Sequence, residues 1–336
     1  MNKPTNLMFM LTLILSVMIS ISSNSWFTMW MGMEINLMSF MPLISEKNNS
    51  SMKESALTYF LVQAIASMIF MMSIVMMIYK NQMEFNKMKN FSKMIMMSSL
   101  AMKSGMSPFH FWMPKMMEGI DWNKCLILMT WQKLIPLMIM SKIIENTMWN
   151  LFIMMSSVIV GAIGGLNQTS LRKLMAYSSI SNNGWMMAAM LISEMTWLTF
   201  FSIYTIMTMV MTNMMNFYKN YHINQLLSMN EITEKKLMIM MNILSISGLP
   251  PMMGFLPKWM LIQMMSNSQL FLMFIMLMTT MIMMYYYLRM MFSSLMIMNT
   301  KPKWNKLSNK INKKMMIMNK VSIMGLTMIT LTLSLI

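Results

Sequence analysis

The chain has 336 residues, of which 57% are apolar and only 11% are charged. A soluble domain typically carries about 25% charged residues, so this chain has too little charge to cover a water-facing surface. The composition excludes an ordinary soluble fold and predicts an all-α polytopic membrane protein. The 65 methionines are spread through nearly every apolar run, which favours apolar filler over Cu(I) ligands.

Several functional classes are excluded by the residues that the chain lacks. The net charge is +16, but only two of the 26 basic residues are arginines, the side chain that nucleic-acid readers favour. A single cysteine, Cys125, excludes intrachain disulfides and iron–sulfur clusters, which need about four thiolates. No nucleotide-binding glycine motif is present. We therefore expect no cofactor, metal or nucleic acid bound to this chain, which leaves chemistry of protons, ions or contacts.

Apolar runs of about 20 residues can span a bilayer, and they follow one another along the whole chain. The eleven predicted spans are 4–22, 25–44, 56–79, 93–114, 123–145, 149–167, 172–192, 196–217, 237–266, 269–294 and 317–336. The first run resembles a signal peptide, but it has no clean small-residue cleavage site and is interpreted as a retained span. An odd number of spans places the two termini on opposite sides of the membrane.

The basic residues divide unevenly between the two sides that these spans define. Eighteen fall on the side of the N-terminus, five on the other side, and three inside spans. The positive-inside rule then predicts a cytoplasmic or matrix N-terminus. The lysine-rich stretch 301–320 is interpreted as a solvated loop facing lipid headgroups, with a docking site for a soluble partner as the alternative.

Four charged residues lie deep inside predicted spans, far from any span end. Glu34, Lys103 and Lys133 are each at least nine residues from both ends of their spans, which at about 1.5 Å per residue places them near the midplane. Lys258 follows a Gly/Pro interruption in its span. Buried charges cost about 2.5–3.5 kcal/mol and are functional candidates, although structural ion pairs are the alternative. Burial disfavours a charged lysine and a nearby carboxylate favours it, so this set predicts a proton relay.

An internal repeat interrupts two of the spans. The pattern S-G-x-x-P-x5-P-K begins at Ser104 and again at Ser247, 143 residues later. Proline lacks an N–H and breaks a helix, so Pro108 and Pro251 remove the helical partners of the two serine carbonyls. Such breaks in corresponding halves indicate a transport path, and chance kinking is the alternative. Pro136 does the same for the Gln132 carbonyl beside Lys133.

Other polar residues allow two interpretations each. Ser178, Ser179, Ser181, Asn182 and Asn183 either line a hydrated path or form hydrogen bonds between helices. His110, within the first interrupted segment, either passes protons or makes a structural hydrogen bond.

Four segments carry a family resemblance: 103–114, 131–136, 171–180 and 247–259. They resemble the antiporter-like subunits of respiratory complex I, and the likeness extends over nearly the whole chain. The family implies two inverted five-helix repeats with one broken helix in each, here 4–145 and 149–294, followed by a loop and last helix over 295–336. One animal mitochondrial branch looks like the bacterial subunit without its first three helices, which agrees with about 11 transmembrane helices.

The resemblance also implies roles for the four buried charges. Glu34 resembles a glutamate that pairs with Lys103 of the first broken helix. Lys133 resembles the central lysine that passes protons along the membrane, and Lys258 the lysine of the second broken helix. One departure is that relatives usually carry a histidine where Asn182 or Asn183 stands.

The function implied is that of a proton-conducting subunit in the mitochondrial inner membrane, with its N-terminus in the matrix. It would act within NADH:ubiquinone reductase, with FMN, iron–sulfur clusters and ubiquinone held by other subunits. The implied partners are membrane lipid and other membrane-arm subunits, especially the chain 4 and chain 4L neighbours, together with supernumerary subunits. The alternatives are an Mrp-like cation/proton antiporter subunit and a purely structural membrane subunit.

Overall fold

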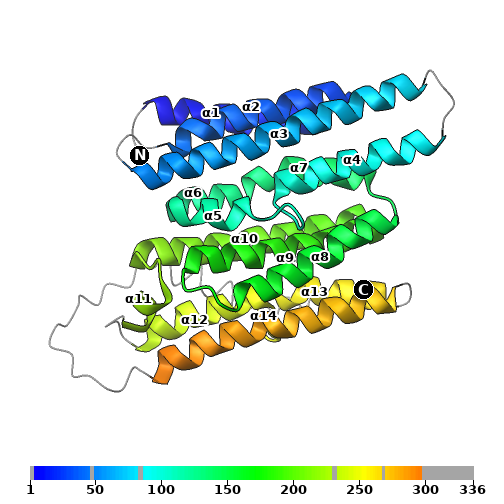
Figure 1. The fold of residues 1–336 in the computed structure, drawn as a ribbon. Coiled ribbons are helices and arrows are strands. Elements are labelled where there is room, and N and C mark those ends of the chain that lie inside the picture. Colours follow the sequence, from blue (N-terminus) through cyan, green and yellow to red (C-terminus); the bar gives the residue numbers. More distant parts are fainter. Residues whose placement is uncertain (1–3, 46–48, 82–85, 229–232, 267–268, 297–336) are drawn as a thin grey trace. The chain divides into compact units, whose positions relative to one another are not determined.

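A computed structural model describes residues 4–45, 49–81, 86–228, 233–266 and 269–296. Within these ranges the chain folds into helices α1–α14 (Figure 1), and one isolated β-bridge joins Ser170 and His222. The predicted all-helical fold class is confirmed. The predicted last span, 317–336, and the lysine-rich stretch 301–320 lie outside the described residues, so the count of eleven spans stays a prediction.

The chain divides into two compact units, Met1–Ser157 and Val158–Ile336. The first contains α1 (Pro4–Ser22), α2 (Trp26–Ile44), α3 (Ser50–Asn81), α4 (Asn86–Ser104), α5 (Trp112–Gly119), α6 (Trp122–Met129) and α7 (Trp131–Ile143). Helix α8 (Met148–Gly165) begins in the first unit and ends in the second. The second unit continues with α9 (Leu171–Ile192), α10 (Glu194–Tyr218), α11 (Ile223–Ser228), α12 (Thr233–Ser247), α13 (Phe255–Met265) and α14 (Leu270–Met296).

Six segments of the described residues are long and apolar enough to cross a membrane. They are Pro4–Ser22, Ser50–Tyr79, Trp122–Ile143, Met148–Gly165, Glu194–Tyr218 and Leu270–Ser294. Large apolar side chains such as Met68 and Phe271 point outward, with 71% and 73% of their surface exposed. An outer surface of this kind requires lipid rather than water.

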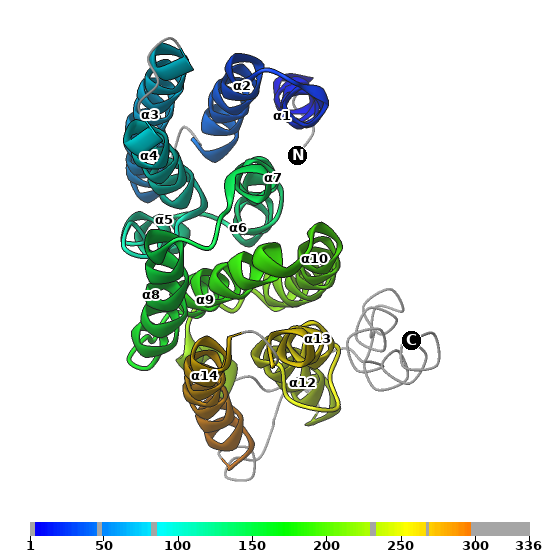
Figure 2. The ribbon, with the colours of Figure 1, turned by 90° about the vertical axis from the view of Figure 1, so that its right-hand side faces the viewer.

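In the first unit the helices surround the ends of α4 and α7. Helix α1 pairs with α2, α2 packs on α3, and α3 packs on both α4 and α5, while α7 packs on α4 (Figure 2). A Cβ on Gly32 of α2 would lie 2.9 Å from the Ser20 Cβ of α1, so only glycine allows this approach. Close contact through small residues is typical of membrane helix pairs.

In the second unit α10 packs on α9, α12 and α13, and α14 packs on α12. Large aromatic side chains fill this unit, and Trp185, Trp197, Tyr286 and Tyr287 are almost completely buried. The result is a packed interior in which polar groups of α9 and α13 are enclosed by protein.

Both predicted helix breaks are present. Helix α4 ends at Ser104 and α12 at Ser247, and each is followed by a glycine in the left-handed region, with φ of +73° at Gly105 and +84° at Gly248. Glycine reaches this region without steric cost and commonly ends a helix. After each break the chain resumes as a short helix, α5 or α13.

The predicted span 123–145 corresponds to the apolar segment Trp122–Ile143, but the helix within it is divided into α6 and α7. Thr130 separates the two helices, with φ −111° and ψ −70°. Its hydroxyl donates to the Leu126 carbonyl at 2.8 Å, a side-chain bond that competes with the helix and bends it. Lys133 consequently lies in the first turn of a helix and not in the middle of one.

Candidate functional site

Lys103 is held at the end of α4 by two other helices of the first unit. Its side chain is buried, and its Nζ lies 3.4 Å from the Met33 Sδ of α2. Its backbone carbonyl accepts a hydrogen bond from the Gln63 Nε2 of α3 at 3.1 Å. Because Lys103 is in the last turn of α4, its positive charge also complements the negative end of the helix dipole.

Glu34 lies beside Lys103 but does not pair with it directly. Glu34 follows Met33 on α2, is half-buried, and acts electrostatically on the Lys103 ammonium. The described part of the chain contains no ion pair between the two side chains. The predicted pair is therefore brought into one neighbourhood without contact, and its role stays a prediction.

Lys133 and Lys103 line the same internal cavity. Lys133 is only 2% exposed. The cavity has a volume of about 20 Å³ and is lined by Tyr59, Gln63, Lys103, Ser104, Trp112, Met113, Leu128, Gln132 and Lys133. This is room for about one water molecule, so a single water can bridge the walls that carry the two lysines.

A chain of hydrogen bonds forms part of the cavity wall. The Tyr59 hydroxyl of α3 donates to the Gln132 Oε1 of α7 at 3.0 Å, and the Gln132 Nε2 donates to the Asn36 Oδ1 of α2 at 2.9 Å. Tyr59 and Gln63 were not among the predicted site residues. Their polar groups within the mostly apolar span 56–79 could have pointed to them.

Lys258 lies in the second broken helix and binds a buried main-chain carbonyl at the break. Its Nζ donates to the Ser247 carbonyl at 2.7 Å, and the Trp185 ring centroid lies 5.8 Å from Nζ. Pro251 was predicted to remove the helical hydrogen-bond donor for this same Ser247 carbonyl. A Cβ on Gly248 would lie 3.0 Å from the Lys258 Cδ, so the glycine also makes space for the lysine.

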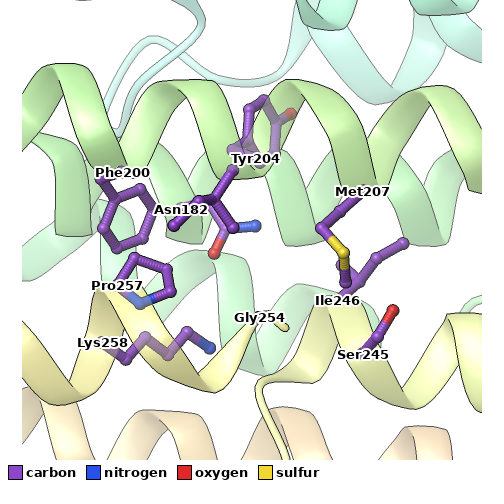
Figure 3. Close-up of a pocket in the computed structure, with 10 residues that line it drawn as sticks. Asn182, Phe200, Tyr204, Met207, Ser245, Ile246, Gly254, Pro257 and Lys258 are labelled. Atoms are coloured by element: carbon purple, nitrogen blue, oxygen red, sulfur yellow. The ribbon is translucent and has the colours of Figure 1, made fainter. Parts of the chain in front are cut away.

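A second cavity of about 20 Å³ adjoins Lys258. Its lining consists of Asn182, Phe200, Ile203, Tyr204, Met207, Ser245, Ile246, Gly254, Pro257 and Lys258. Figure 3 shows Asn182 of α9 and Lys258 of α13 on opposite walls. Asn182, and not Asn183, lines this cavity, so it is the asparagine placed to act with Lys258.

The remaining polar candidates keep both of their interpretations. Ser178 and Ser179 are buried and donate to carbonyls of their own helix, at 2.8 Å and 2.6 Å. His110 is buried within the first break, with its ring centroid 4.2 Å from that of Phe111.

Burial of a lysine does not by itself identify a transfer site. Lys124 and Lys236 were counted among the 18 basic residues on the side of the N-terminus, but both are buried and bind carbonyls near helix ends, Ile44 O at 3.4 Å and Leu227 O at 3.0 Å. Basic side chains stabilise helix C-termini in this way. Lys103, Lys133 and Lys258 differ in kind because each lines a cavity able to hold water.

Comparisons with known proteins identify this many-helix membrane fold as that of an antiporter-like membrane subunit. A family model described as NADH:quinone oxidoreductase/Mrp antiporter, transmembrane, matches residues 23–284. Relatives named NADH-ubiquinone oxidoreductase chain 2 are 43% identical in Anopheles gambiae and 47% identical in Aedes aegypti, each over 98% of both chains. The relative in Locusta migratoria is 42% identical over 97% of this chain and 96% of its own. The chain belongs to the NADH-ubiquinone oxidoreductase chain 2 family.

Solved structures of respiratory and antiporter complexes share the fold. A chain of respiratory complex I from Thermus thermophilus matches with a TM-score of 0.78 at 18% identity, covering 98% of this chain and 78% of that one. An archaeal membrane-bound sulfane sulfur reductase matches at 0.81 and 15% identity, covering 96% and 72%. The Mrp complex from Dietzia matches at 0.75 and 14%, covering 84% of this chain and 59% of that one.

Proposed function

We propose that the chain is a core membrane-arm subunit of mitochondrial complex I that conducts protons across the inner membrane. Lys103, Lys133 and Lys258 would carry the protons, and Glu34 would control the charge of Lys103. The observation that carries this proposal is that Lys103 and Lys133, both buried and both at helix breaks, line one water-sized cavity.

The proposed mechanism depends on the distance between Glu34 and Lys103. Burial disfavours the ammonium form of a lysine, and a neighbouring carboxylate restores it. Lys103 would take up a proton as Glu34 approaches and release it toward Lys133 as Glu34 withdraws. In the second unit, Lys258 would be the corresponding proton-binding group, held by the Ser247 carbonyl.

The surroundings of the chain follow from the same proposal. The subunit would act as part of NADH:ubiquinone reductase, with FMN, iron–sulfur clusters and ubiquinone held by other subunits. Its neighbours would be membrane lipid, chain 4, chain 4L and supernumerary subunits, and its N-terminus would face the matrix. The repeats would comprise 4–145 and 149–294, with the last helix within 295–336.

The second candidate function is cation/proton exchange of the Mrp type, which the family description includes. Purification distinguishes the two. Co-migration with an NADH-oxidising assembly supports the complex I role, whereas sodium-dependent exchange by the isolated chain supports the antiporter. A purely structural subunit would instead show normal turnover of assembled complexes that carry Glu34→Gln or Lys103→Met.

The proposed role of Lys133 is tested by Lys133→Met in the assembled complex. Lys142→Met is the matched control, because Lys142 lies on the same helix but is exposed. We expect Lys133→Met to lower NADH-driven proton uptake into vesicles by about tenfold or more, as loss of a proton-transfer group does, and Lys142→Met to leave it unchanged. Equal proton uptake by the two variants would contradict the proposal.

A further inference from the structure

The hydrogen bonds around the cavity between Lys103 and Lys133 have defined donors and acceptors. Gln132 uses its amide nitrogen as a donor to the Asn36 side chain, so its amide oxygen is the group that meets Tyr59. An amide oxygen only accepts hydrogen bonds. The Tyr59 hydroxyl proton is therefore committed to Gln132, at 3.0 Å.

This commitment makes the Tyr59 oxygen an acceptor toward the cavity. A phenol has one proton to donate and retains lone pairs when that proton is used. Tyr59 is 3% exposed and lines the cavity, so these lone pairs are available to a group inside the protein and not to bulk water. Only a donor in the cavity can satisfy them.

Gln63 adds a second acceptor to the same wall. Its amide nitrogen donates to the Lys103 backbone carbonyl at 3.1 Å. The polar group that remains for the cavity is its amide oxygen, which accepts hydrogen bonds. Two neutral side chains of α3 thus present oxygen acceptors to a space bordered by two lysines.

A cavity with this lining favours a guest rich in N–H or O–H protons. A lysine ammonium brings three donors and no acceptor, and a protonated water is likewise a donor. Hydrogen bonds to charged donors are stronger than those between neutral groups. The lining therefore lowers the free energy of the positively charged carrier more than that of a neutral guest.

We propose that Tyr59 positions the protonated carrier that passes through this cavity from Lys103 to Lys133. The inference rests on the proposed proton-conducting function. One N–H bond of the Lys103 ammonium breaks as its proton passes to the cavity water. A different O–H proton of that water then forms the new N–H bond on Lys133. One positive charge moves and the water is restored. The Tyr59 hydroxyl keeps its proton, which stays hydrogen-bonded to the Gln132 oxygen.

Tyr59→Phe in the assembled complex tests this role, because it removes the acceptor oxygen and keeps the ring. The matched control is Tyr79→Phe, on the same helix but 68% exposed. We expect Tyr59→Phe to slow NADH-driven proton uptake by about fivefold, the effect of one lost hydrogen bond. Heavy water should also slow proton uptake by Tyr59→Phe more than uptake by Tyr79→Phe, because proton transfer becomes rate-limiting in the first variant. Loss of packing alone would not change that isotope effect.

The Lys133→Met variant separates failure of this inference from failure of the proposed function. If Tyr59 acts through transfer to Lys133, Tyr59→Phe combined with Lys133→Met should be no slower than Lys133→Met alone. Normal proton uptake by Tyr59→Phe, together with loss in Lys133→Met, would overturn the role of Tyr59 only. Normal proton uptake by both single variants would overturn the proposed function.

Discussion

The two broken helices share one sequence motif but place their lysines on opposite sides of the break. In the first, Lys103 precedes the break, and the motif lysine, Lys115, is exposed. In the second, the motif lysine, Lys258, is buried, and Ile246 stands where the 143-residue offset would put a counterpart of Lys103. The motif thus determines where the helix breaks, and the surrounding helices determine which lysine is enclosed.

The two glycines show how the packing differs. A Cβ on Gly105 would lie 2.9 Å from the Met113 Sδ, whereas a Cβ on Gly248 would lie 3.0 Å from the Lys258 Cδ. The same left-handed turn therefore packs on a thioether in the first unit and on an ammonium-bearing chain in the second. Only the second break makes direct room for a charged side chain.

The largest expected effect comes from exchanging the two motif lysines for methionine. Lys258→Met should lower NADH-driven proton uptake by the assembled complex by about tenfold or more, because it removes a proton-transfer group. Lys115→Met should leave it unchanged, because the Lys115 side chain is exposed. Proton uptake into vesicles, normalised to assembled complex, measures both. Similar losses in both variants would mean that the motif, and not burial beside the cavity, determines function.

Much of the helix arrangement was predictable from apolar run length. The predicted span 4–22 coincides with α1, and both Gly/Pro breaks lie where the motif placed them. The short helix α11 was not predicted, because its six residues are too few for a periodic apolar pattern. The division at Thr130 was also missed, because a side-chain bond to one carbonyl leaves no sequence pattern.

The site was predictable as residues but not as an arrangement. Depth within a span identified Lys103 and Lys133, since charge is costly there. That they line one cavity depends on the packing of α3, α4 and α7, which no local pattern encodes. The burial of Lys124 and Lys236 was not predicted, because charge near a span end does not reveal which carbonyl it binds.

A smaller effect should separate the two glycines. Gly248→Ala and Gly105→Ala both force a left-handed alanine, at a cost of about 1–2 kcal/mol, so both should lower the thermal stability of the assembled complex. Only Gly248→Ala should also lower turnover, because its Cβ would displace Lys258, whereas the flexible Met113 can move aside. Thermal inactivation and NADH:ubiquinone turnover measure the two effects. Equal turnover of the two variants would contradict this distinction.

The smallest expected effect concerns the support of Lys103 by α3. Gln63→Leu removes the donor to the Lys103 carbonyl, which should cost about 1 kcal/mol of stability. Ser67→Ala is the control, because the Ser67 hydroxyl donates only to a carbonyl of its own helix, Ala64 O at 2.7 Å. Thermal inactivation of the assembled complex compares them. A greater loss of stability in Ser67→Ala would show that Gln63 does not hold the break.

The most direct test of the account is the number of protons translocated per NADH oxidised by complexes that carry Lys103→Met. Proton translocation and NADH oxidation would be recorded together in vesicles, with the amount of assembled complex measured separately. If the buried lysines carry the protons, the variant should assemble normally, with a lower proton-to-NADH ratio or with turnover that falls together with proton translocation. A normal ratio at normal turnover would contradict the claim that the buried lysines carry the protons.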